Sequence, residues 1–253
     1  MLNNYHTHTV FCDGADTPEE IVLKAIELGC KEIGFSGHSY TEFDTCYCMS
    51  PEKLEEYKKT VLSLKEKYKD KIKVLLGIEL DYYSDIDTTD FDYIIGSVHY
   101  VKKNGQYLSV DHSKELFVKN VTEYYNGDYY AFMEDYFKTV ANVYNKTKCD
   151  IIGHFDLIRK FNGDGEFLDE SCERYKTAVL GALSSLLKAP CVFEFNTGAI
   201  SRGYKGITYP SNDVLKILKK LKKKVIFSSD CHNKEYLLFG QELYKNVKND
   251  VAL

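Results

Sequence analysis

Short apolar runs that alternate with amphipathic stretches are the dominant feature of this chain of 253 residues. The runs are rich in β-branched and aromatic residues and lack a clean two-residue alternation, which is typical of strands buried on both faces of a parallel sheet. The short NYH segment near the start is the first of seven candidate strands. The other six are residues 31–37, 73–80, 92–98, 149–155, 191–196 and 224–230.

Helix-start signals lie between these runs. Thr17, Pro18 and Glu20 together predict an N-cap, a first-turn proline and a capping box, and Gly29 predicts the end of that helix. The pair Ser50 and Pro51 repeats the start signal. Apolar residues at helical spacing predict three later helices, the last of them capped by Ser211: Phe132, Tyr136, Val140 and Tyr144; Tyr175, Val179, Leu183 and Leu187; Leu215, Leu218 and Leu221.

The strands and helices alternate without a Pro/Gly/Ser-rich linker or an internal repeat, which predicts a single α/β domain. An open, doubly wound sheet is one arrangement for such a chain. The regular spacing of seven strand–helix units favours the other, a barrel.

Composition narrows the function. The formal net charge of −5 argues against nucleic-acid binding driven by a basic face. No apolar run approaches the ~18 residues of a membrane span, and the N-terminus does not resemble a signal peptide. The eight cysteines are scattered and include no C-x₂-C pair, so we expect reduced thiols in a cytoplasmic protein without nucleic-acid or membrane partners.

Histidines occur at the ends of the candidate strands. Of the seven in the chain, only His112 does not lie at or just after such an end; the other six are His6, His8, His38, His99, His154 and His232. In a barrel the carboxyl ends of all strands converge on one face. Imidazoles gathered there indicate metal binding.

Three carboxylates follow the same rule: Asp13, Glu79 and Asp230. Together with the six histidines they are too many for one zinc ion, which takes four ligands, so we expect two or three divalent ions. Nitrogen and oxygen donors without thiolate favour Zn, Mn or Fe. Such ions activate water and neutralise phosphate charge, which indicates hydrolysis of a phosphate ester.

Only three arginines occur in this lysine-rich chain. Arg174 lies in a predicted helix and is expected at the surface. Arg159 and Arg202 lie in loops that follow predicted strands on the metal-bearing face. Because a guanidinium can hold a phosphate with two parallel hydrogen bonds, we interpret these two residues as ligands of the substrate phosphate.

The segments HTH, SGHS, GIELD, GSVHYV, DIIGHFDLIRKFN and SSDCH resemble, in this order, the motifs of the PHP (polymerase and histidinol phosphatase) family. The resemblance runs from residue 5 to about residue 232 and is closest to stand-alone histidinol-phosphatases. It implies a distorted (β/α)₇ barrel over residues 1–253, in agreement with the seven candidate strands.

The resemblance also implies a ligand arrangement for three metals. The first would be held by His6, His8, Glu79 and Asp230, the second by Glu79, His99 and His154, and the third by Asp13, His38 and His232. Many family members have histidine where Asp13 stands, so the third site departs from the common pattern. Arg159 and Arg202 match the arginines that would hold the substrate phosphate.

The implied reaction is hydrolysis of the small-molecule monoester L-histidinol phosphate, a late step in histidine biosynthesis, with Asp230 orienting or deprotonating the attacking water. His112, Asp156 and the tyrosines at 124–130 are candidates to recognise the rest of the substrate. One alternative is a PHP phosphoesterase that acts on a nucleotide, a nucleic-acid end or a phosphotyrosine. Another is a metal-dependent binding protein without catalysis, which the complete set of nine ligand residues disfavours.

Overall fold

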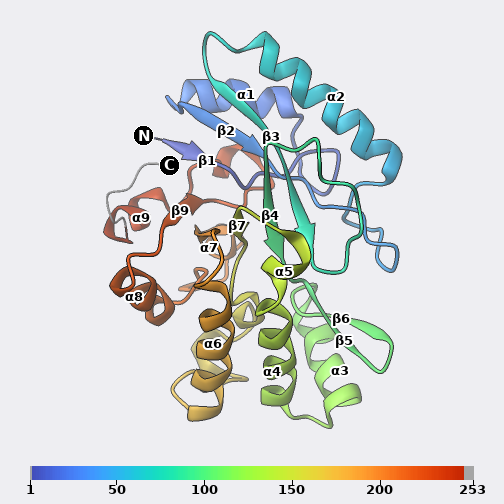
Figure 1. Cartoon of the computed structure of the whole chain (residues 1–253), viewed down its shortest axis with the longest axis vertical. Coiled ribbons are helices and arrows are strands. Elements are labelled where there is room, and N and C mark those ends of the chain that lie inside the picture. Colours follow the sequence, from blue (N-terminus) through green and yellow to red (C-terminus); the bar gives the residue numbers. More distant parts are fainter. Residues whose placement is uncertain (1, 248–253) are drawn as a thin grey trace.

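The computed structural model describes residues 2–247 and contains one seven-stranded parallel sheet, whose strands are adjacent in sequence order (Figure 1). The strands are β1 (Asn3–Asn4), β2 (Glu32–Phe35), β3 (Lys73–Asp81), β4 (Tyr93–Ser97), β7 (Ile151–Ile152), β8 (Val192–Asn196) and β9 (Val225–Ser228). Beyond β9 the chain returns to the first strand: His8 N donates to Cys231 O at 2.9 Å, and Cys231 N donates to His6 O at 3.3 Å. The sheet is therefore a nearly closed barrel, which confirms the predicted seven-stranded fold.

Helices surround the barrel. They are α1 (Pro18–Glu27), α2 (Pro51–Lys67), α3 (Lys114–Tyr125), α4 (Tyr129–Val140), α5 (Val143–Thr147), α6 (Glu173–Leu186), α7 (Gly198–Ser201), α8 (Asn212–Lys220) and α9 (Gln241–Val247). Three single 3₁₀ turns, η1 (Leu157–Arg159), η2 (Gly163–Gly165) and η3 (Lys234–Tyr236), lie in the loops. Figure 1 shows α1 and α2 at one end of the molecule and α3, α4 and α6 at the other.

The predicted helix starts are confirmed. Thr17 and Glu20 form the capping box of α1, and the side chains of Ser50 and Ser211 cap α2 and α8. One predicted helix is divided, because α4 ends at Val140 and Tyr144 belongs to α5. The helices α3 and α9 were not predicted.

A hairpin that the periodicity did not predict follows β4. Its strands are β5 (Tyr100–Lys103) and β6 (Gln106–Ser109), and they pair antiparallel. The two residues between them, Asn104 and Gly105, have φ angles of +49° and +82°. An Asn-Gly pair with two positive φ angles is a strong signal for a tight hairpin turn. This hairpin leads into α3 and carries part of the wall of the functional site.

The barrel interior is filled by a small cluster of side chains around Tyr93. The Tyr93 hydroxyl lies 2.5 Å from Tyr5 O and 3.0 Å from Phe35 O and shares its one proton between these two carbonyls, so it connects neighbouring strands. Gly34 and Gly77 make room for this side chain. A Cβ at Gly34 would lie 2.4 Å from the Tyr93 hydroxyl oxygen, and a Cβ at Gly77 would lie 2.2 Å from Tyr93 Cζ. Because these side chains fill the interior of the barrel, the open space lies at the carboxyl ends of the strands.

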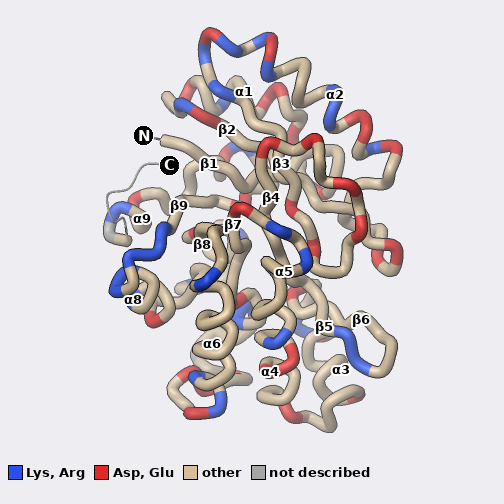
Figure 2. Tube along the Cα trace, in the orientation of Figure 1, with Lys and Arg blue, Asp and Glu red and all other residues tan. Residues whose placement is uncertain are grey.

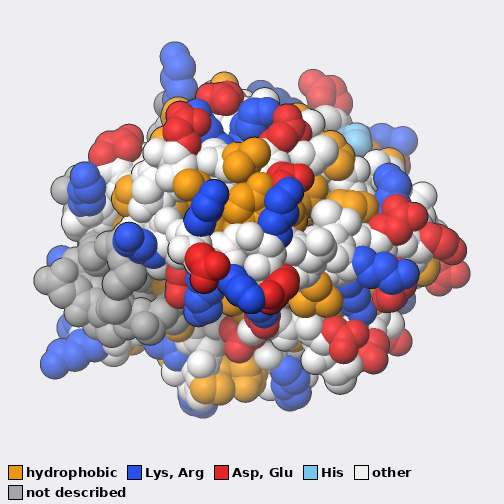
Figure 3. Space-filling view, turned by 90° about the horizontal axis from the view of Figure 1, so that it is seen from above, with side chains coloured by type: hydrophobic (Ala, Val, Ile, Leu, Met, Phe, Trp, Pro, Cys, Tyr) orange, Lys and Arg blue, Asp and Glu red, His pale blue; other side chains and the backbone are white. Residues whose placement is uncertain are grey.

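The surface is mixed in charge. Figure 2 shows acidic and basic residues interspersed along the helices, with Lys219 and Lys220 in the last turn of α8. Viewed from the side of α1 and α2, apolar groups are interrupted by charged side chains (Figure 3); Leu23 and Leu62 are large exposed apolar residues of these helices. No helix within residues 2–247 is long and apolar enough to span a membrane.

Candidate metal centre

Two histidines leave the first strand side by side. β1 ends at Asn4, and the chain continues extended, with Thr7 bridged to Cys231. The Thr7 hydroxyl donates to Gly34 O at 2.6 Å, so Thr7 points to one side of the backbone. His6 and His8 point to the other side and are fully buried, with ring centroids 5.2 Å apart. The two-residue spacing thus places both imidazoles at one point, as the sequence predicts.

The carboxylate of Glu79 lies at the centre of the imidazoles. Its Oε1 atom is 2.9 Å from His154 Nε2 and 3.4 Å from His99 Nε2. Its Oε2 atom is 3.2 Å from His6 Nε2, 3.5 Å from His8 Nε2 and 2.9 Å from His38 Nδ1. The two oxygens therefore face different sets of nitrogen atoms, as a carboxylate that bridges two metals must.

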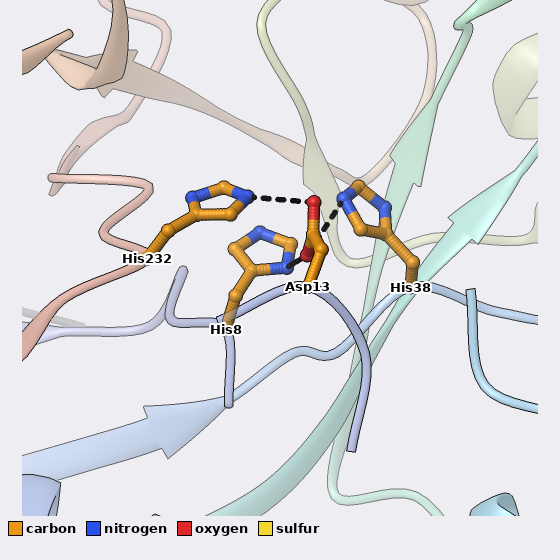
Figure 4. Close-up of side chains that lie close together, drawn as sticks. All are labelled: His8, Asp13, His38 and His232. Carbon is orange, nitrogen blue, oxygen red and sulfur yellow. Dashed lines mark ion pairs between the residues drawn. The ribbon is translucent and has the colours of Figure 1, made fainter. Parts of the chain in front are cut away.

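A second, more open cluster surrounds Asp13 (Figure 4). Asp13 Oδ2 is 3.2 Å from His232 Nε2, and Oδ1 is 3.6 Å from His8 Nδ1 and 3.7 Å from His38 Nε2. The Asp13 side chain is 32% exposed, against 1% for Glu79. Gly14 allows the sharp turn that presents Asp13, because a Cβ there would lie 2.4 Å from Thr9 N.

Asp230 links the two clusters. Its Oδ1 atom is 3.3 Å from His8 Nε2 and 3.7 Å from His6 Nε2. Its Oδ2 atom accepts hydrogen bonds from Arg202 (3.1 Å) and Asn196 (3.2 Å). The φ angle of Asp230 is +48°, a left-handed conformation that costs a residue other than glycine about 1–3 kcal/mol. The bonds to Oδ2 hold this conformation and leave Oδ1 directed at the histidines.

Two carboxylates outside these clusters orient the histidines. Glu194 Oε2 lies 2.8 Å from His6 Nδ1, and Asp81 Oδ2 lies 3.1 Å from His99 Nδ1. An ionised carboxylate only accepts hydrogen bonds, so each of these Nδ1 atoms carries a proton. Nε2 of His6 and of His99 is then free to bind a metal, which is the usual arrangement behind metal-binding histidines.

Burial and opposite charge shift the pKa values of the buried groups in opposite directions. Burial lowers the pKa of His6, but Glu194, Glu79 and Asp230 raise it well above the usual value. The pKa values of His38 and His99 are also raised, chiefly by Glu79 acting against burial. Burial raises the pKa of Glu79, but the surrounding histidines lower it well below its usual value. Without a metal, protons on His6, His38 and His99 therefore balance the charge of the carboxylates.

The donors fit divalent metals. His6 Nε2, His8 Nε2 and Glu79 Oε2 are buried and have no hydrogen-bond partner among the described residues. Three groups of donor atoms lie close enough together to share an ion: His6, His8 and Glu79; His38, Glu79 and His99; His8, Asp13, His38 and His232. Since His8 and His38 each belong to two of these groups, the donors form one continuous candidate metal centre. Nitrogen and oxygen donors of this kind suit zinc and similar ions.

A cavity of about 280 Å³ opens onto this centre. One side is lined by Asp13, Glu79, Asp230 and histidines of the metal centre. The hairpin and the segment that follows it contribute Tyr100, Ser109, Asp111 and His112, and Lys160 and Arg202 complete the charged lining. Lys160 Nζ donates to Asp111 Oδ2 at 3.1 Å and to Asp111 O at 2.7 Å. The cavity thus combines a metal centre with two fixed cations.

The pattern that defines the PHP domain matches residues 4–198 of this sequence, which is most of the chain. The chain belongs to the PHP domain family. The Bacillus subtilis histidinol-phosphatase is 25% identical to it over 253 residues, which cover 90% of this chain and 92% of that protein.

Two solved structures share the architecture. A Listeria monocytogenes protein described as a candidate histidinol phosphatase, HisK, has a TM-score of 0.84 at 26% identity, covering 96% of this chain and all of the other. Lactococcus lactis histidinol phosphate phosphatase, solved with zinc, L-histidinol and phosphate, has a TM-score of 0.66 at 22% identity, covering 97% and 93%. The resemblance found in the sequence motifs is therefore confirmed at the level of family and fold.

This PHP domain brings together all nine residues expected to bind metal, but it places the two loop arginines differently. Arg202 lines the cavity. The guanidinium of Arg159 donates to Glu170 (2.9 Å) and to Thr208 O (3.1 Å), and Arg159 is not among the residues that line the cavity. The 3₁₀ turn η1 ends at Arg159, so the next residue, Lys160, faces the cavity instead.

Other expected substrate contacts are also placed. His112 is exposed and lines the cavity. Asp156 is fully buried and accepts a hydrogen bond from Ser211 N at 2.8 Å, away from the cavity lining. The tyrosines at 124–130 pack in or against the large hydrophobic core. The Tyr125 hydroxyl, for example, donates to Asp135 Oδ2 at 3.0 Å. Neither Asp156 nor these tyrosines line the cavity as described.

Sequence reasoning missed Glu194, Asp81 and the Asp111–Lys160 pair. Glu194 sits in the middle of the otherwise apolar run CVFEFN, and Asp81 ends the run GIELD. A carboxylate within a strand that is buried on both faces needs a partner, because an unpaired buried charge is costly. That signal was available for Glu194. No comparable signal marks Asp111, whose place depends on the hairpin.

Proposed function

We propose that this PHP domain is a histidinol-phosphatase, a metal-dependent phosphomonoesterase that converts L-histidinol phosphate and water to L-histidinol and inorganic phosphate. The observation that carries the proposal is the buried Glu79 carboxylate, ringed by five imidazoles, at the floor of a cavity that also holds Arg202 and Lys160. The names and bound molecules of the relatives supply the substrate.

The site would hold two or three divalent ions. We assign one to His6, His8, Glu79 and Asp230, one to Glu79, His99 and His154, and one to Asp13, His38 and His232. Ions held there would lower the pKa of a water molecule and offset the charge of the phosphate. Zinc is present in the Lactococcus lactis structure, and Mn or Fe would suit the same donors.

Fixed cations in the cavity bind the phosphate oxygens in this proposal. Arg202 Nη1 contacts Asp230 O and His232 Nδ1, and one Nη2–H binds Asp230 Oδ2. Among the described residues the other N–H groups, on Nε and Nη2, have no partner, and we assign them to the phosphate. Lys160 adds a second positive charge to the lining. Arg159 would reach the same phosphate only after releasing Glu170 and Thr208 O, so we assign it a smaller role than the sequence suggests.

Asp230 positions the attacking water. Burial raises its pKa, but Arg202 and His6 lower it well below the usual range, so this carboxylate stays ionised. Oδ2 is held by Arg202 and Asn196, and Oδ1 faces His6 and His8. An ionised, fixed oxygen orients a water through a hydrogen bond, and its low pKa makes it a weak base. We therefore assign Asp230 orientation more than proton abstraction.

We also propose that residues 1–253 form one PHP domain. Asp230 and His232 lie beyond the matched residues 4–198, yet they complete the same metal centre. All eight cysteines are free thiols, which supports a cytoplasmic location.

The test is a comparison of substrates with the purified, metal-loaded protein. Phosphate release is measured from L-histidinol phosphate, a nucleoside monophosphate, phosphotyrosine and p-nitrophenyl phosphate. We expect kcat/KM for L-histidinol phosphate to exceed that for each of the others by at least about 100-fold. A preference for the nucleotide or for phosphotyrosine would favour the alternative PHP phosphoesterase. No turnover of any monoester with Zn, Mn or Fe would contradict the enzymatic assignment.

A further inference from the structure

The cavity contains a negative charge that phosphate binding does not require. Asp111 follows the hairpin, two residues after β6 ends at Ser109 and two before Ser113 caps α3. It lines the same cavity as Glu79, Arg202 and the histidines of the metal centre. Its side chain is 24% exposed, so it is accessible to a molecule bound in the cavity.

Lys160 binds only one of the two oxygen atoms of the Asp111 carboxylate. Its ammonium lies 3.1 Å from Asp111 Oδ2, and no hydrogen bond to Asp111 Oδ1 occurs within the described part of the chain. An ionised carboxylate has about four lone-pair directions, so Oδ1 can accept further donors. Burial works to raise the pKa of Asp111, and Lys160, His99 and His154 lower it to about 2, so the group is charged at neutral pH.

A free anionic oxygen is unfavourable in a cavity that binds a phosphate dianion. Two like charges close together at low dielectric repel each other, and the repulsion would weaken the binding of every phosphate monoester alike. The arrangement becomes favourable when the substrate carries a cation next to its phosphate. L-Histidinol phosphate does, because its ammonium group is on the carbon adjacent to the phosphate-bearing CH₂.

We propose that Asp111 Oδ1 receives the ammonium group of the substrate and makes this residue a determinant of specificity for amine-bearing phosphate monoesters. The inference rests on the proposed function, whose substrate it specifies further. Lys160 holds the other carboxylate oxygen and so fixes the direction of Oδ1. Tyr47 and Tyr100, which line the same cavity, provide aromatic surface beyond the ammonium for the imidazole ring.

The alternative role for Asp111 is to position Lys160 for the phosphate, and the two roles predict different substrate dependence. An ammonium receptor affects only substrates that carry the amine. An anchor for Lys160 affects all phosphate monoesters equally. A comparison of substrates with and without the amine therefore separates the two.

The experiment uses Asp111→Asn, which keeps the shape and removes the charge. We expect kcat/KM for L-histidinol phosphate to fall about 10- to 100-fold. The kcat/KM for p-nitrophenyl phosphate should not fall, because the same change also removes the repulsion between Asp111 and the phosphate. In equilibrium binding, Kd for L-histidinol should rise by a similar factor, and Kd for N-acetyl-L-histidinol, which lacks the positive charge, should not change.

A matched control is Asp135→Asn. Asp135 pairs with Lys103 at 3.0 Å and is 25% exposed, so its ion pair resembles that of Asp111 but lies outside the cavity lining. This variant should leave both substrates unchanged. Thermal unfolding and metal content of both variants establish that the fold and the metal centre are retained.

Equal losses on both substrates, or no loss on either, would overturn the inference. Failure of the proposed function would look different, because the parent protein would then show no preference for L-histidinol phosphate. If the parent instead preferred another amine-bearing monoester, loss of that preference in Asp111→Asn would still support the ammonium site. Retention of the preference would refute it.

Discussion

Glu194→Gln tests how the metal centre is oriented without removing a residue assigned to a metal. Oε2 of Glu194 accepts the proton of His6 Nδ1 at 2.8 Å. Oε1 accepts from His154 N at 2.6 Å and from Asn196 Nδ2 at 2.8 Å. Glutamine has nearly the same shape, but one of its two terminal atoms is a donor. One of these two sets of contacts must therefore be lost.

The orientation of the new amide follows from the number of donors on each side. If its NH₂ group faced His154 N and Asn196, two buried donors would lose their acceptor, at about 1–3 kcal/mol each. If the NH₂ group faces His6 Nδ1, only the imidazole has to change: Nδ1 becomes an acceptor and the proton moves to Nε2. The second arrangement costs less, and it protonates the nitrogen that faces Glu79.

A protonated Nε2 cannot bind a metal, so the loss falls on the ion assigned to His6. Loss of such a supporting carboxylate typically reduces metal affinity about 10- to 100-fold, which corresponds to about 1.4–2.8 kcal/mol. The fold should be affected less, because the side chain keeps its volume and two of its hydrogen bonds, and the third only reverses its direction.

The assay is metal titration of chelator-treated protein, followed by calorimetry and by turnover of p-nitrophenyl phosphate. Glu194→Gln should need about 10- to 100-fold more free metal for half-maximal binding, and excess metal should restore part of the turnover. Glu32→Gln is the control, since Glu32 accepts hydrogen bonds from Tyr5 (2.5 Å) and Lys73 (3.0 Å) outside the site. A metal affinity of Glu194→Gln within about threefold of the parent would refute the tautomer argument.

Three further predictions concern the same centre. Glu79→Gln removes a charge shared by two of the proposed metal sites and should cost at least two metals per chain; elemental analysis that finds full occupancy, with near-normal turnover, would exclude the bridging role. Arg202→Lys keeps the charge but loses the planar fork, so kcat/KM should fall about 10- to 100-fold with metal content unchanged. Arg174→Ala, on an exposed pair with Glu134 and Asp128, should have almost no effect, and equal losses at both arginines would argue against phosphate binding by Arg202. Finally, in chelator-treated protein the stability should fall as the pH rises above about 6.5. The three histidines with raised pKa values contribute stability that is complete below about pH 6.5 and lost as the pH passes their folded-state values. Melting temperatures with and without metal check this, and a metal-free protein whose stability rose over that range would contradict it.

Much of the fold follows from local sequence. The capping box at Thr17 and Glu20 satisfies backbone groups within one turn, so its effect does not depend on distant residues. The buried strands were likewise predictable, because apolar runs of that length have few other structures available. The break between α4 and α5 was not, since the same four-residue spacing continues through Tyr144.

The meeting of the candidate metal ligands was predictable for a related reason. In a parallel barrel every strand delivers its carboxyl end to one face, so a histidine at a strand end has a known destination before any packing is considered. His6, His99 and Glu79 meet as that rule requires. Chain topology alone converts their positions in the sequence into proximity.

Tertiary structure decided the residues that lie in loops. Arg159 and Lys160 are adjacent, and the phase of one 3₁₀ turn determines that the lysine faces the cavity while the arginine pairs with Glu170. Asp111 reaches the cavity because the β5–β6 hairpin returns the chain to the segment after β4, where Val110 N donates to His99 O at 3.0 Å. A strand end has its direction set by the sheet, whereas a loop side chain takes its direction from contacts with residues far away in the sequence. The sequence by itself therefore determined the barrel and the convergence of the candidate metal ligands, and the packing of the loops determined which charges line the cavity.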